Sequence, residues 1–422
     1  MPEFLKLLPA KEAMERLLSH LPQPSPPIEF IPTADALGRV TARPIISPEN
    51  LPPFSRSTVD GFAVKASSTH GASDTLPVYL TLIGEVSMGT APQFSIRLGE
   101  AALIYTGGML PEGADAVVML ENTQIVRQSS QGGQFGELEV LHAVASGENL
   151  IQVGEDVQAG EVVLPAGVRL RPAEIGALLA LGILEVPVAR FPQVGILSSG
   201  DEVVPPEVHP AVGQVRDVNS YSLRALIQRH GGKSTLYGVL PDRPMVLRET
   251  LAHALAECDL VVITAGSSAS ARDLTASVIQ EMGEPGVLVH GIQIRPGKPT
   301  ILAVCNGKAV VGLPGNPVSA LVIAGLFVAP LVDRLQGVLL GVPQSGVPAR
   351  LATNISSLAG REDWIPVRLV PDQKGGFLAE PIFFKSNLIF NLARADGLVC
   401  IPADATGLDV NETVQVMLLA EF

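Results

Sequence analysis

AVVGLPGNPVSALVIAGLFV, residues 309–328, carries the clearest fold signal in this chain. AVVGL has the length and composition of a buried strand. A short loop with Gly315 follows it, and an apolar helix is expected at residues 318–328. A strand that runs through a glycine-containing loop into a helix is typical of an α/β unit.

The same alternation extends back from this segment to residue 192. Leu223, Leu226 and Ile227 share one face of an expected helix, and Leu247 and Leu251 share a face of the next. We therefore expect a parallel sheet covered by helices on both faces. The expected strands are 194–197, 234–239, 260–264, 287–289 and 309–313, and the expected helices are 221–230, one that begins at Pro244, 274–282 and 318–328.

Short strand-like runs lie on both sides of this unit. Residues 76–170 contain apolar runs rich in Val, Ile and Leu that are separated by glycine, which is typical of a β-rich region. From residue 349 the chain returns to short strands, for which a small β-barrel or sandwich is expected. These C-terminal runs are WIPVRLV, FLAEPIF, GLVCIP and TVQVMLL.

Composition excludes several classes of protein. A net charge of -13 argues against a general nucleic-acid binder, which needs a basic face. The N-terminus reads as a short amphipathic helix without the features of a signal peptide. The longest apolar run, residues 320–332, falls short of the roughly 20 residues of a membrane span. Cys258, Cys305 and Cys400 show no disulfide or zinc spacing. We expect a cytoplasmic protein that binds neither nucleic acid nor membrane.

Three polar loops follow expected strands of the sheet, at residues 197–206, 264–273 and 313–320. Ligands of an open parallel sheet bind at the carboxyl ends of its strands, so we expect a ligand site where these loops meet. Gly266 and Gly315 would let backbone approach a ligand. The helix after Pro317 would favour a phosphate through its free N–H groups.

Charged residues near these loops suit a phosphorylated ligand. RPGKP, residues 295–299, places two cations on a proline-stiffened segment and predicts an anion clamp. Glu202, Asp242 and Asp273 fall near expected strand ends, where Mg²⁺ would relieve their mutual repulsion. Each acid could instead be a solvated loop residue or a helix cap. Two further loops mix polar residues with glycine, PPFSRSTVDGFAV at 52–64 and YTGGMLPEGADAVV at 105–118.

These motifs together resemble the molybdopterin molybdenumtransferase family of the gephyrin E-domain type. The resemblance rests on the two loops just quoted and on VGEDVQAGEVVLPAG, SSGDEVV, IRPGKP, GLPGNPVSALV and GREDW, in family order over nearly the whole chain. It implies an elongated, four-domain homodimer. The implied domains are a β-rich linker (28–50 and 148–185), a β-rich domain (51–147), an α/β molybdopterin-binding domain (1–27 and 186–335) and a C-terminal β-barrel (336–422).

The resemblance also implies a reaction. The family takes adenylylated molybdopterin and molybdate with Mg²⁺, cleaves the phosphoanhydride and releases AMP. The upstream molybdopterin adenylyltransferase and recipient molybdoenzymes are the implied protein partners. Carried over by motif, the catalytic residues are Asp60, Thr106, Asp156 and Glu202; the metal ligands are Glu202, Asp242 and Asp273; and the substrate-binding residues are Ser57, Ser268, Arg295, Lys298, Pro314, Asn316, Pro317, Arg361 and Ser386.

The chain departs from the family in the second loop of the α/β domain. Ala265 and Ser270 stand at two glycine positions, where a positive φ would cost about 1 kcal/mol or more. Gly291 stands where many members carry a lysine. Two other functions therefore stay open: a protein that holds the pterin without turnover or acts as a scaffold, and an enzyme of this fold that uses tungstate or catalyses adenylylation.

Overall fold

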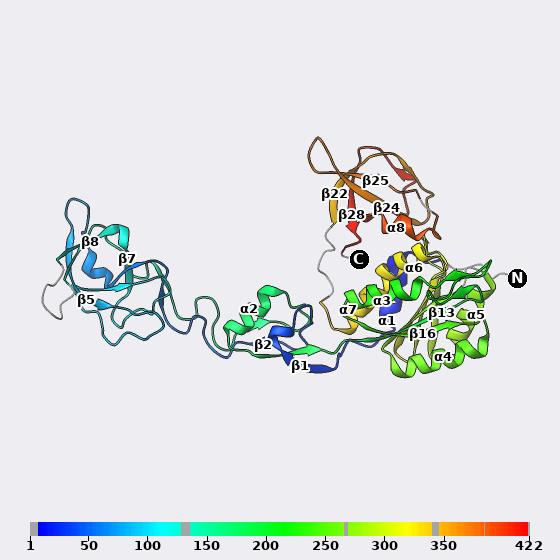
Figure 1. Ribbon diagram of the computed structural model, residues 1–422, viewed down its shortest axis with the longest axis horizontal. Helices are drawn as coiled ribbons and strands as arrows, with labels where there is room; N and C mark the ends of the chain where they lie inside the picture. Colours follow the sequence, from blue (N-terminus) through cyan, green and yellow to red (C-terminus); the bar gives the residue numbers. More distant parts are fainter. Residues whose placement is uncertain (1–6, 128–135, 266–268, 340–345, 384, 421–422) are drawn as a thin grey trace.

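The computed structural model describes residues 7–127, 136–265, 269–339, 346–383 and 385–420 of the 422-residue chain. Figure 1 shows an elongated molecule. A distal β unit stands at one end, a narrow linker unit follows it, and an α/β unit lies at the other end with a C-terminal barrel beside it. This arrangement confirms the expected fold class.

The distal β unit is built on a six-stranded sheet in the order β7-β4-β6-β5-β9-β8. Phe62 and Val118 are buried in its core. The glycine of the DGFAV motif is required here, because a Cβ on Gly61 would lie 2.0 Å from the carbonyl oxygen of Val118. The elements are β3 (Arg56–Ser57), β4 (Gly61–Val64), η2 (Ala66–Thr69), β5 (Val78–Glu85), β6 (Glu100–Ile104), β7 (Ala116–Met119), η3 (Leu120–Asn122), β8 (Thr123–Arg127), β9 (Glu137–Val140) and β10 (Leu150–Ile151), which pairs with β3.

The linker unit is crossed twice by the chain and has a small core around Leu170 and Leu178. Its helix α2 (Pro172–Ala180) begins with proline, which suits the first helical position. Glu174 accepts a hydrogen bond from the N–H of Arg171 at 2.8 Å and so completes a capping box. The other elements are β1 (Ile28–Pro32), which pairs with β12 (Glu185–Ala189), β2 (Ile45–Ile46), which pairs with β11 (Val162–Leu164), and η1 (Thr33–Asp35).

The α/β unit contains a sheet in the order β16-β13-β17-β21-β20-β18. The strands β16, β13, β17 and β21 run parallel, as expected. One strand departs from this: β20 runs antiparallel to both of its neighbours, β21 and β18, so the edge strand β18 points in the same direction as β21. The strands are β13 (Gln193–Ser199), β16 (Lys233–Leu240), β17 (Leu260–Ala265), β18 (Pro285–His290), β20 (Ile301–Cys305) and β21 (Lys308–Pro314), with the short pair β14 (Val203–Val204) and β15 (Val215–Arg216) outside the sheet.

The strand β20 was missed by the sequence interpretation. It forms a hairpin with β21 through Asn306 and Gly307, whose φ angles are 52° and 83°. Asn-Gly is the dipeptide that a tight hairpin turn with two positive φ angles prefers, so the sequence did contain the signal.

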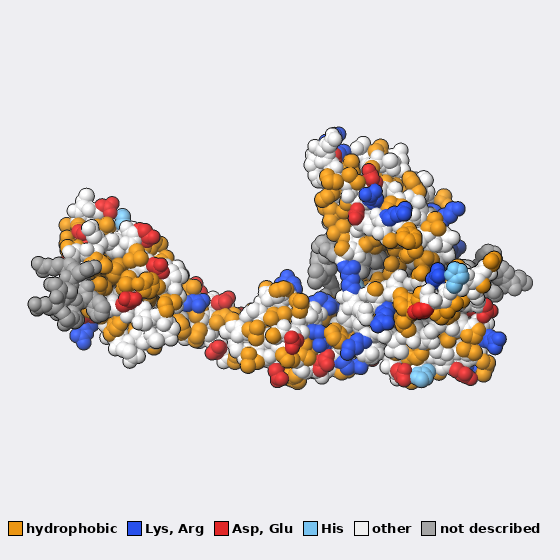
Figure 2. Space-filling model, viewed as in Figure 1, with side chains coloured by type: hydrophobic (Ala, Val, Ile, Leu, Met, Phe, Trp, Pro, Cys, Tyr) orange, Lys and Arg blue, Asp and Glu red, His pale blue; other side chains and the backbone are white. Residues whose placement is uncertain are grey.

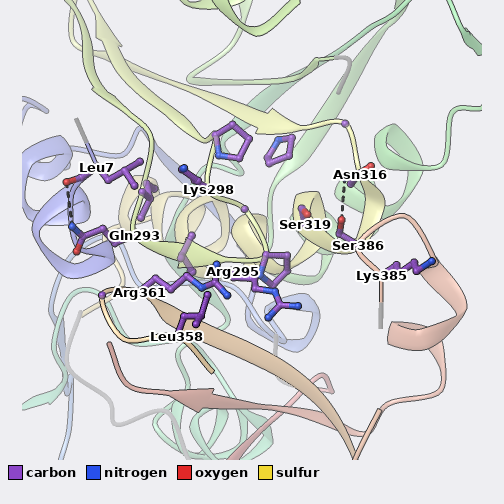
Figure 3. Close-up of a pocket in the computed structure, with 18 of the residues that line it drawn as sticks. Leu7, Gln293, Arg295, Lys298, Asn316, Ser319, Leu358, Arg361, Lys385 and Ser386 are labelled. Atoms are coloured by element: carbon purple, nitrogen blue, oxygen red, sulfur yellow. Dashed lines mark hydrogen bonds between the residues drawn. The ribbon is translucent and has the colours of Figure 1, made fainter. Parts of the chain in front are cut away.

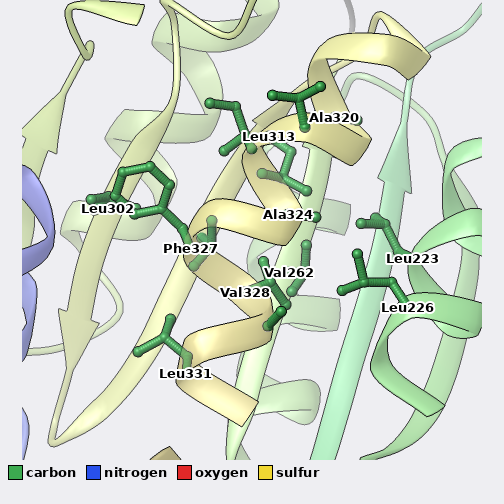
Figure 4. Close-up of a cluster of buried hydrophobic side chains, with 14 of the residues drawn as sticks. Leu223, Leu226, Val262, Leu302, Leu313, Ala320, Ala324, Phe327, Val328 and Leu331 are labelled. Carbon is green, nitrogen blue, oxygen red and sulfur yellow. The ribbon is translucent and has the colours of Figure 1, made fainter. Parts of the chain in front are cut away.

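Helices cover both faces of this sheet, as expected. One face carries α1 (Ala10–Ser19), α3 (Asn219–Arg229) and the long helix formed by α6 (Pro317–Ile323), η4 (Ala324–Val328) and α7 (Ala329–Leu335). Figure 4 shows Leu223, Val262 and Phe327 packed together there. The other face carries α4 (Pro244–Glu257) and α5 (Ala269–Gln280).

The long helix at residues 317–335 exceeds the apolar run that the sequence suggested. Its 19 residues are long and apolar enough to cross a membrane by length and composition. However, 67% of its most apolar window is buried inside the protein, where Val328 and Leu331 pack on the sheet. Burial of this kind is typical of a core helix.

The C-terminal unit is a closed barrel, which decides between the two forms expected. Its strands follow the cycle β24-β25-β22-β28-β26 and return to β24. The strand β19 (Ile294–Arg295) of the α/β unit adds to this sheet in parallel with β24. The remaining elements are β22 (Gly346–Leu351), β23 (Ile355–Ser356), β24 (Glu362–Pro371), β25 (Phe377–Pro381), α8 (Ile389–Ala393), β26 (Gly397–Ile401), β27 (Gly407–Leu408) and β28 (Thr413–Leu418).

Candidate active site

The carboxyl ends of β13, β17 and β21 meet at one edge of the sheet, because these strands are parallel neighbours. A pocket of about 400 Å³ opens there, which confirms that the loops converge. We call it the acidic pocket. It is lined by Ser198, Ser199, Glu202, Val203, Val215, Arg216, Asp217, Val218, Asn219, Thr264, Ala265, Gly315, Asn316, Pro317, Asn387 and Ile389.

Neutral groups position the carboxylates around the acidic pocket. Ser199 Oγ donates to Asp242 Oδ1 at 2.6 Å, which places Asp242 directly behind the pocket wall. Asp217, which was not predicted, accepts the Ser220 N–H in the first turn of α3 (Asn219–Arg229) at 3.1 Å. An aspartate just before an expected helix was the available sequence signal. Arg216, the one cation among the described lining residues, donates to the Pro206 carbonyl at 3.1 Å.

A second pocket of about 640 Å³ lies beside the first, at the junction of the α/β unit and the barrel. We call it the cationic pocket, because Arg295, Lys298, Arg361 and Lys385 line it and none of its described lining residues is acidic. Figure 3 shows Arg295 and Arg361 close together in this pocket, with Lys298 apart from them in the same lining. Lys385 was not among the predicted residues.

A single buried carboxylate holds both arginines. Asp363, on β24, is 0% exposed. It accepts from Arg295 Nη1 at 3.3 Å and from Arg361 Nε at 2.8 Å. Sequence reasoning noted the GREDW motif but assigned no role to its aspartate. An acid directly before the apolar run WIPV was the available signal, since such a residue is rarely fully buried without a partner.

The RPGKP segment needs its glycine. Gly297 has a φ of 116°, and a Cβ there would lie 2.3 Å from Ile323 Cγ1 on the long helix. Arg295 and Lys298 thus stand on a segment pressed against the core, which restricts where these two cations can lie.

Gly315 and Asn316 line both pockets and separate them. Asn316 Nδ2 donates to Ser386 Oγ at 3.0 Å (Figure 3). Asn219 Nδ2 donates to the Gly315 carbonyl at 2.8 Å. Pro314 and Pro317 flank this wall. One expectation needs correction: the Val318 N–H already donates to the Ser386 carbonyl at 3.1 Å, so this helix amide is not free for a phosphate.

The predicted residues of the N-terminal half do not reach either pocket within one chain. Asp60 Oδ1 accepts from the N–H and the Oγ1 of Thr106 at 2.7 and 2.8 Å, and these bonds lower the pKa of Asp60. Ser57 is buried, and its Oγ donates to the Val59 carbonyl at 2.6 Å. The Asp156 N–H donates to the Leu51 carbonyl at 3.0 Å. Ser57, Asp60 and Thr106 lie in the distal β unit, far from the α/β unit (Figure 1). Asp156 lies in the linker unit, beside residues of helix α2.

The altered loop of the α/β unit is partly described. Ser268 lies outside the described residues, and so does the side chain of Asp273. The expected strain at Ala265 is absent, because Ala265 is the last residue of β17 and pairs with Pro314 of β21. Ser270 lies within helix α5, where φ is negative. Neither residue therefore needs the freedom of glycine. Gly291, at the family's lysine position, has a φ of 106°.

Comparisons with known proteins agree over the whole chain. Three family models match in order: MoeA N-terminal region (domain I and II) over residues 8–182, probable molybdopterin binding domain over 195–334, and MoeA C-terminal region (domain IV) over 348–419.

Relatives and solved structures match at full length. A molybdopterin molybdenumtransferase from Nostoc sp. is 32% identical, with 93% of this chain and 88% of that protein covered. One from Bacillus subtilis is 31% identical, with 98% and 94% covered. The crystal structure of a molybdopterin biosynthesis MoeA protein from Pyrococcus horikoshii matches with a TM-score of 0.83 at 34% identity, over 98% of this chain and 100% of that one.

Proposed function

The chain belongs to the molybdopterin molybdenumtransferase family and is a transferase of molybdenum cofactor biosynthesis, and we propose that it inserts molybdenum from molybdate into adenylylated molybdopterin. The proposed reaction requires Mg²⁺, breaks the phosphoanhydride bond and releases AMP. The observation that supports it is the pair of oppositely charged pockets on either side of Gly315 and Asn316.

The cationic pocket is the proposed place of the oxyanion. Four cationic side chains line it, and none of its described lining residues is acidic. Asp363, which is not a lining residue, accepts hydrogen bonds from both arginines behind the pocket wall. Arginine forks match the oxygens of an oxyanion, and lysine adds a compact charge. Positive charge that is fixed before the anion arrives needs little reorganisation during the reaction. These residues would bind molybdate and stabilise negative charge beside the phosphoanhydride.

The acidic pocket is the proposed place of Mg²⁺ and the nucleotide side of the substrate. The described side chains include no group of three His, Cys, Asp or Glu that could form a complete metal cage. Mg²⁺ commonly takes only one or two carboxylates and keeps water or phosphate as its other ligands, so Glu202 and Asp242 fit that mode. When bound, the ion would offset phosphate charge. Asp273 remains a predicted third ligand.

We further propose that the working unit is a homodimer whose second copy supplies Asp60 and Thr106 to the pockets. Two observations support this. The distal β unit cannot contact the pockets of its own chain in the arrangement of Figure 1. The linker unit also exposes apolar side chains, including Leu37 at 64% and Leu184 at 70% (Figure 2). Asp156 and Ser57 remain predicted site residues of the same half.

The proposal includes a cytoplasmic location. Its protein partners would be the adenylyltransferase that makes the substrate and the molybdoenzymes that receive the product. The scaffold alternative loses its main argument, because Ala265 and Ser270 impose no backbone strain.

The test is AMP release from purified adenylylated molybdopterin, with and without molybdate and Mg²⁺. We expect release that requires both ions, and we expect Arg361→Ala to raise the molybdate concentration needed for half-maximal rate. Lys374→Glu, on a barrel hairpin outside both pocket linings, is the control. Tight binding of the pterin without any AMP release would refute the transfer reaction.

A further inference from the structure

Asp363 joins two parts of the molecule at the cationic pocket. It lies on β24 of the barrel and is the register partner of Arg295 on β19 of the α/β unit. Its Oδ2 accepts from Arg295 Nη1 at 3.3 Å and from Ser357 Oγ at 2.9 Å, and its Oδ1 accepts from Arg361 Nε at 2.8 Å. One carboxylate therefore fixes two guanidinium groups that come from different domains.

Asp363 accepts from only some of the N–H donors of each guanidinium group. Among the described residues, the Nε and Nη2 of Arg295 and the Nη1 of Arg361 have no protein acceptor. The side chain of Arg295 is 51% exposed and that of Arg361 is 32% exposed, whereas Asp363 is fully buried. The carboxylate thus binds the arginines from behind, and their remaining donors are available to the pocket that both residues line.

We propose that Asp363 is a positioning residue of the oxyanion site, which sets the spacing and direction of Arg295 and Arg361. This inference deepens the proposed function, since it takes molybdate as the occupant of the cationic pocket. Asp363 does not touch the anion. It acts by holding two flexible side chains in one arrangement, so that the entropy of ordering them is not lost when the anion binds.

The direction of the change in oxyanion affinity distinguishes positioning from a simple charge effect. Replacing Asp363 by asparagine removes a negative charge behind the pocket. Coulomb attraction alone then predicts tighter binding of a divalent oxyanion. Positioning predicts weaker binding, because an asparagine amide cannot hold two guanidinium groups in the same way.

A matched control is present in the same barrel. Arg350 Nε donates to Asp372 Oδ2 at 2.9 Å, and the Asp372 side chain is only 6% exposed. Neither residue lines the cationic pocket. Asp372→Asn therefore removes a nearly buried, arginine-held carboxylate of the same domain without touching the pocket. The molybdate affinity of Asp372→Asn shows how much a loss of barrel stability alone weakens binding.

The experiment is direct binding of molybdate to the full-length protein by calorimetry, which needs no turnover. We expect Asp363→Asn to weaken molybdate binding about tenfold or more, as loss of a supporting partner commonly does, while Asp372→Asn binds as the wild type does. Unchanged or tighter binding in Asp363→Asn would overturn the inference, and so would equal losses in both variants. A wild-type protein that binds no molybdate overturns it as well.

Two further measurements keep the result decisive. Wild type that binds molybdate but releases no AMP refutes the proposed reaction and leaves the binding comparison intact. Should Asp363→Asn fail to fold, Arg295→Lys keeps the charge but loses the fork that Asp363 holds. Positioning then predicts a loss of molybdate affinity of about fivefold or more, and an unchanged affinity would overturn the inference.

Discussion

The distal β unit and the α/β unit both present polar residues on glycine-rich loops, but they present them differently. In the distal unit, Asp60 is satisfied by Thr106 on its own surface. In the α/β unit, Arg295 and Lys298 line a pocket of about 640 Å³. Only one nitrogen of Arg295, Nη1, donates to Asp363. The first arrangement can complete a site that another surface provides, and the second can receive a ligand. This difference is what the proposed site shared between two chains requires.

The largest expected effect is the recovery of AMP release in a mixed dimer of two variants that are each inactive alone. Asp60→Asn and Lys298→Glu are each expected to lose nearly all AMP release, because charges a few ångströms apart interact by about 4 kcal/mol at intermediate dielectric. A dimer with one copy of each keeps one intact composite site, so it should recover about half of the wild-type rate. Co-expressed chains with different tags, purified through both tags, provide this dimer.

The control for this experiment pairs two charge-reversed variants of the cationic pocket, Arg295→Glu with Lys298→Glu. This dimer should stay inactive, because both changes fall on the same half of each composite site. Recovery in neither dimer would mean that the distal unit and the pockets do not share a site across two chains.

A second prediction concerns the acidic pocket alone. Glu202→Gln and Asp242→Asn should each raise the Mg²⁺ concentration for half-maximal AMP release on the order of tenfold, while the KM for molybdate stays unchanged. Mg²⁺ titration at fixed molybdate measures this. Asp259→Asn is the control, since Asp259 pairs with Arg190 and lines neither pocket. An equal rise in the KM for molybdate would mean that the two pockets are not separate.

A third prediction tests how firmly the cations of the α/β unit are held. Gly297→Ala adds a Cβ 2.3 Å from Ile323 at a φ of 116°, whereas Gly238→Ala has a φ of 85° and nothing within 4 Å. We expect a loss of about 1 kcal/mol from backbone strain in Gly238→Ala and about 1–3 kcal/mol more from overpacking in Gly297→Ala. Urea unfolding measures both. Equal losses would show that the contact with Ile323 is unimportant.

The smallest expected effect lies in the distal unit and depends on pH. Hydrogen bonds from the N–H and the hydroxyl of Thr106 lower the pKa of Asp60, so Asp60 stays ionised to a lower pH than usual. Thr106→Val keeps the N–H and removes the hydroxyl. The pKa of Asp60 should rise, and the acid limb of the activity profile should move to higher pH.

The control for the pH profile is Thr123→Val, whose hydroxyl donates to the Leu120 carbonyl in the same unit. Its acid limb should match that of the wild type. If the limb stays in place in Thr106→Val as well, the ionisation of Asp60 does not limit the rate.

The sequence by itself determined the fold class and the edge of the parallel sheet at which its loops converge. Apolar periodicity located α3, α4, β13, β17 and β21, because burial on a sheet or a helix face leaves a regular pattern in the chain. The parallel order of these strands then required their loops to meet, and the acidic pocket lies there. The cations of RPGKP were also found correctly as part of a pocket lining.

Only the tertiary structure decided which polar groups already have a hydrogen-bond partner within the protein and which can still bind a ligand. Asp363 and Arg295 lie 68 positions apart in the chain, and their contact depends on how the barrel docks on the α/β unit. The same docking places the Ser386 carbonyl where it accepts a hydrogen bond from the Val318 N–H. Sequence patterns report local backbone preference and burial. The pairing of distant polar groups depends on the packing of whole domains, for which a single sequence contains no periodic signal.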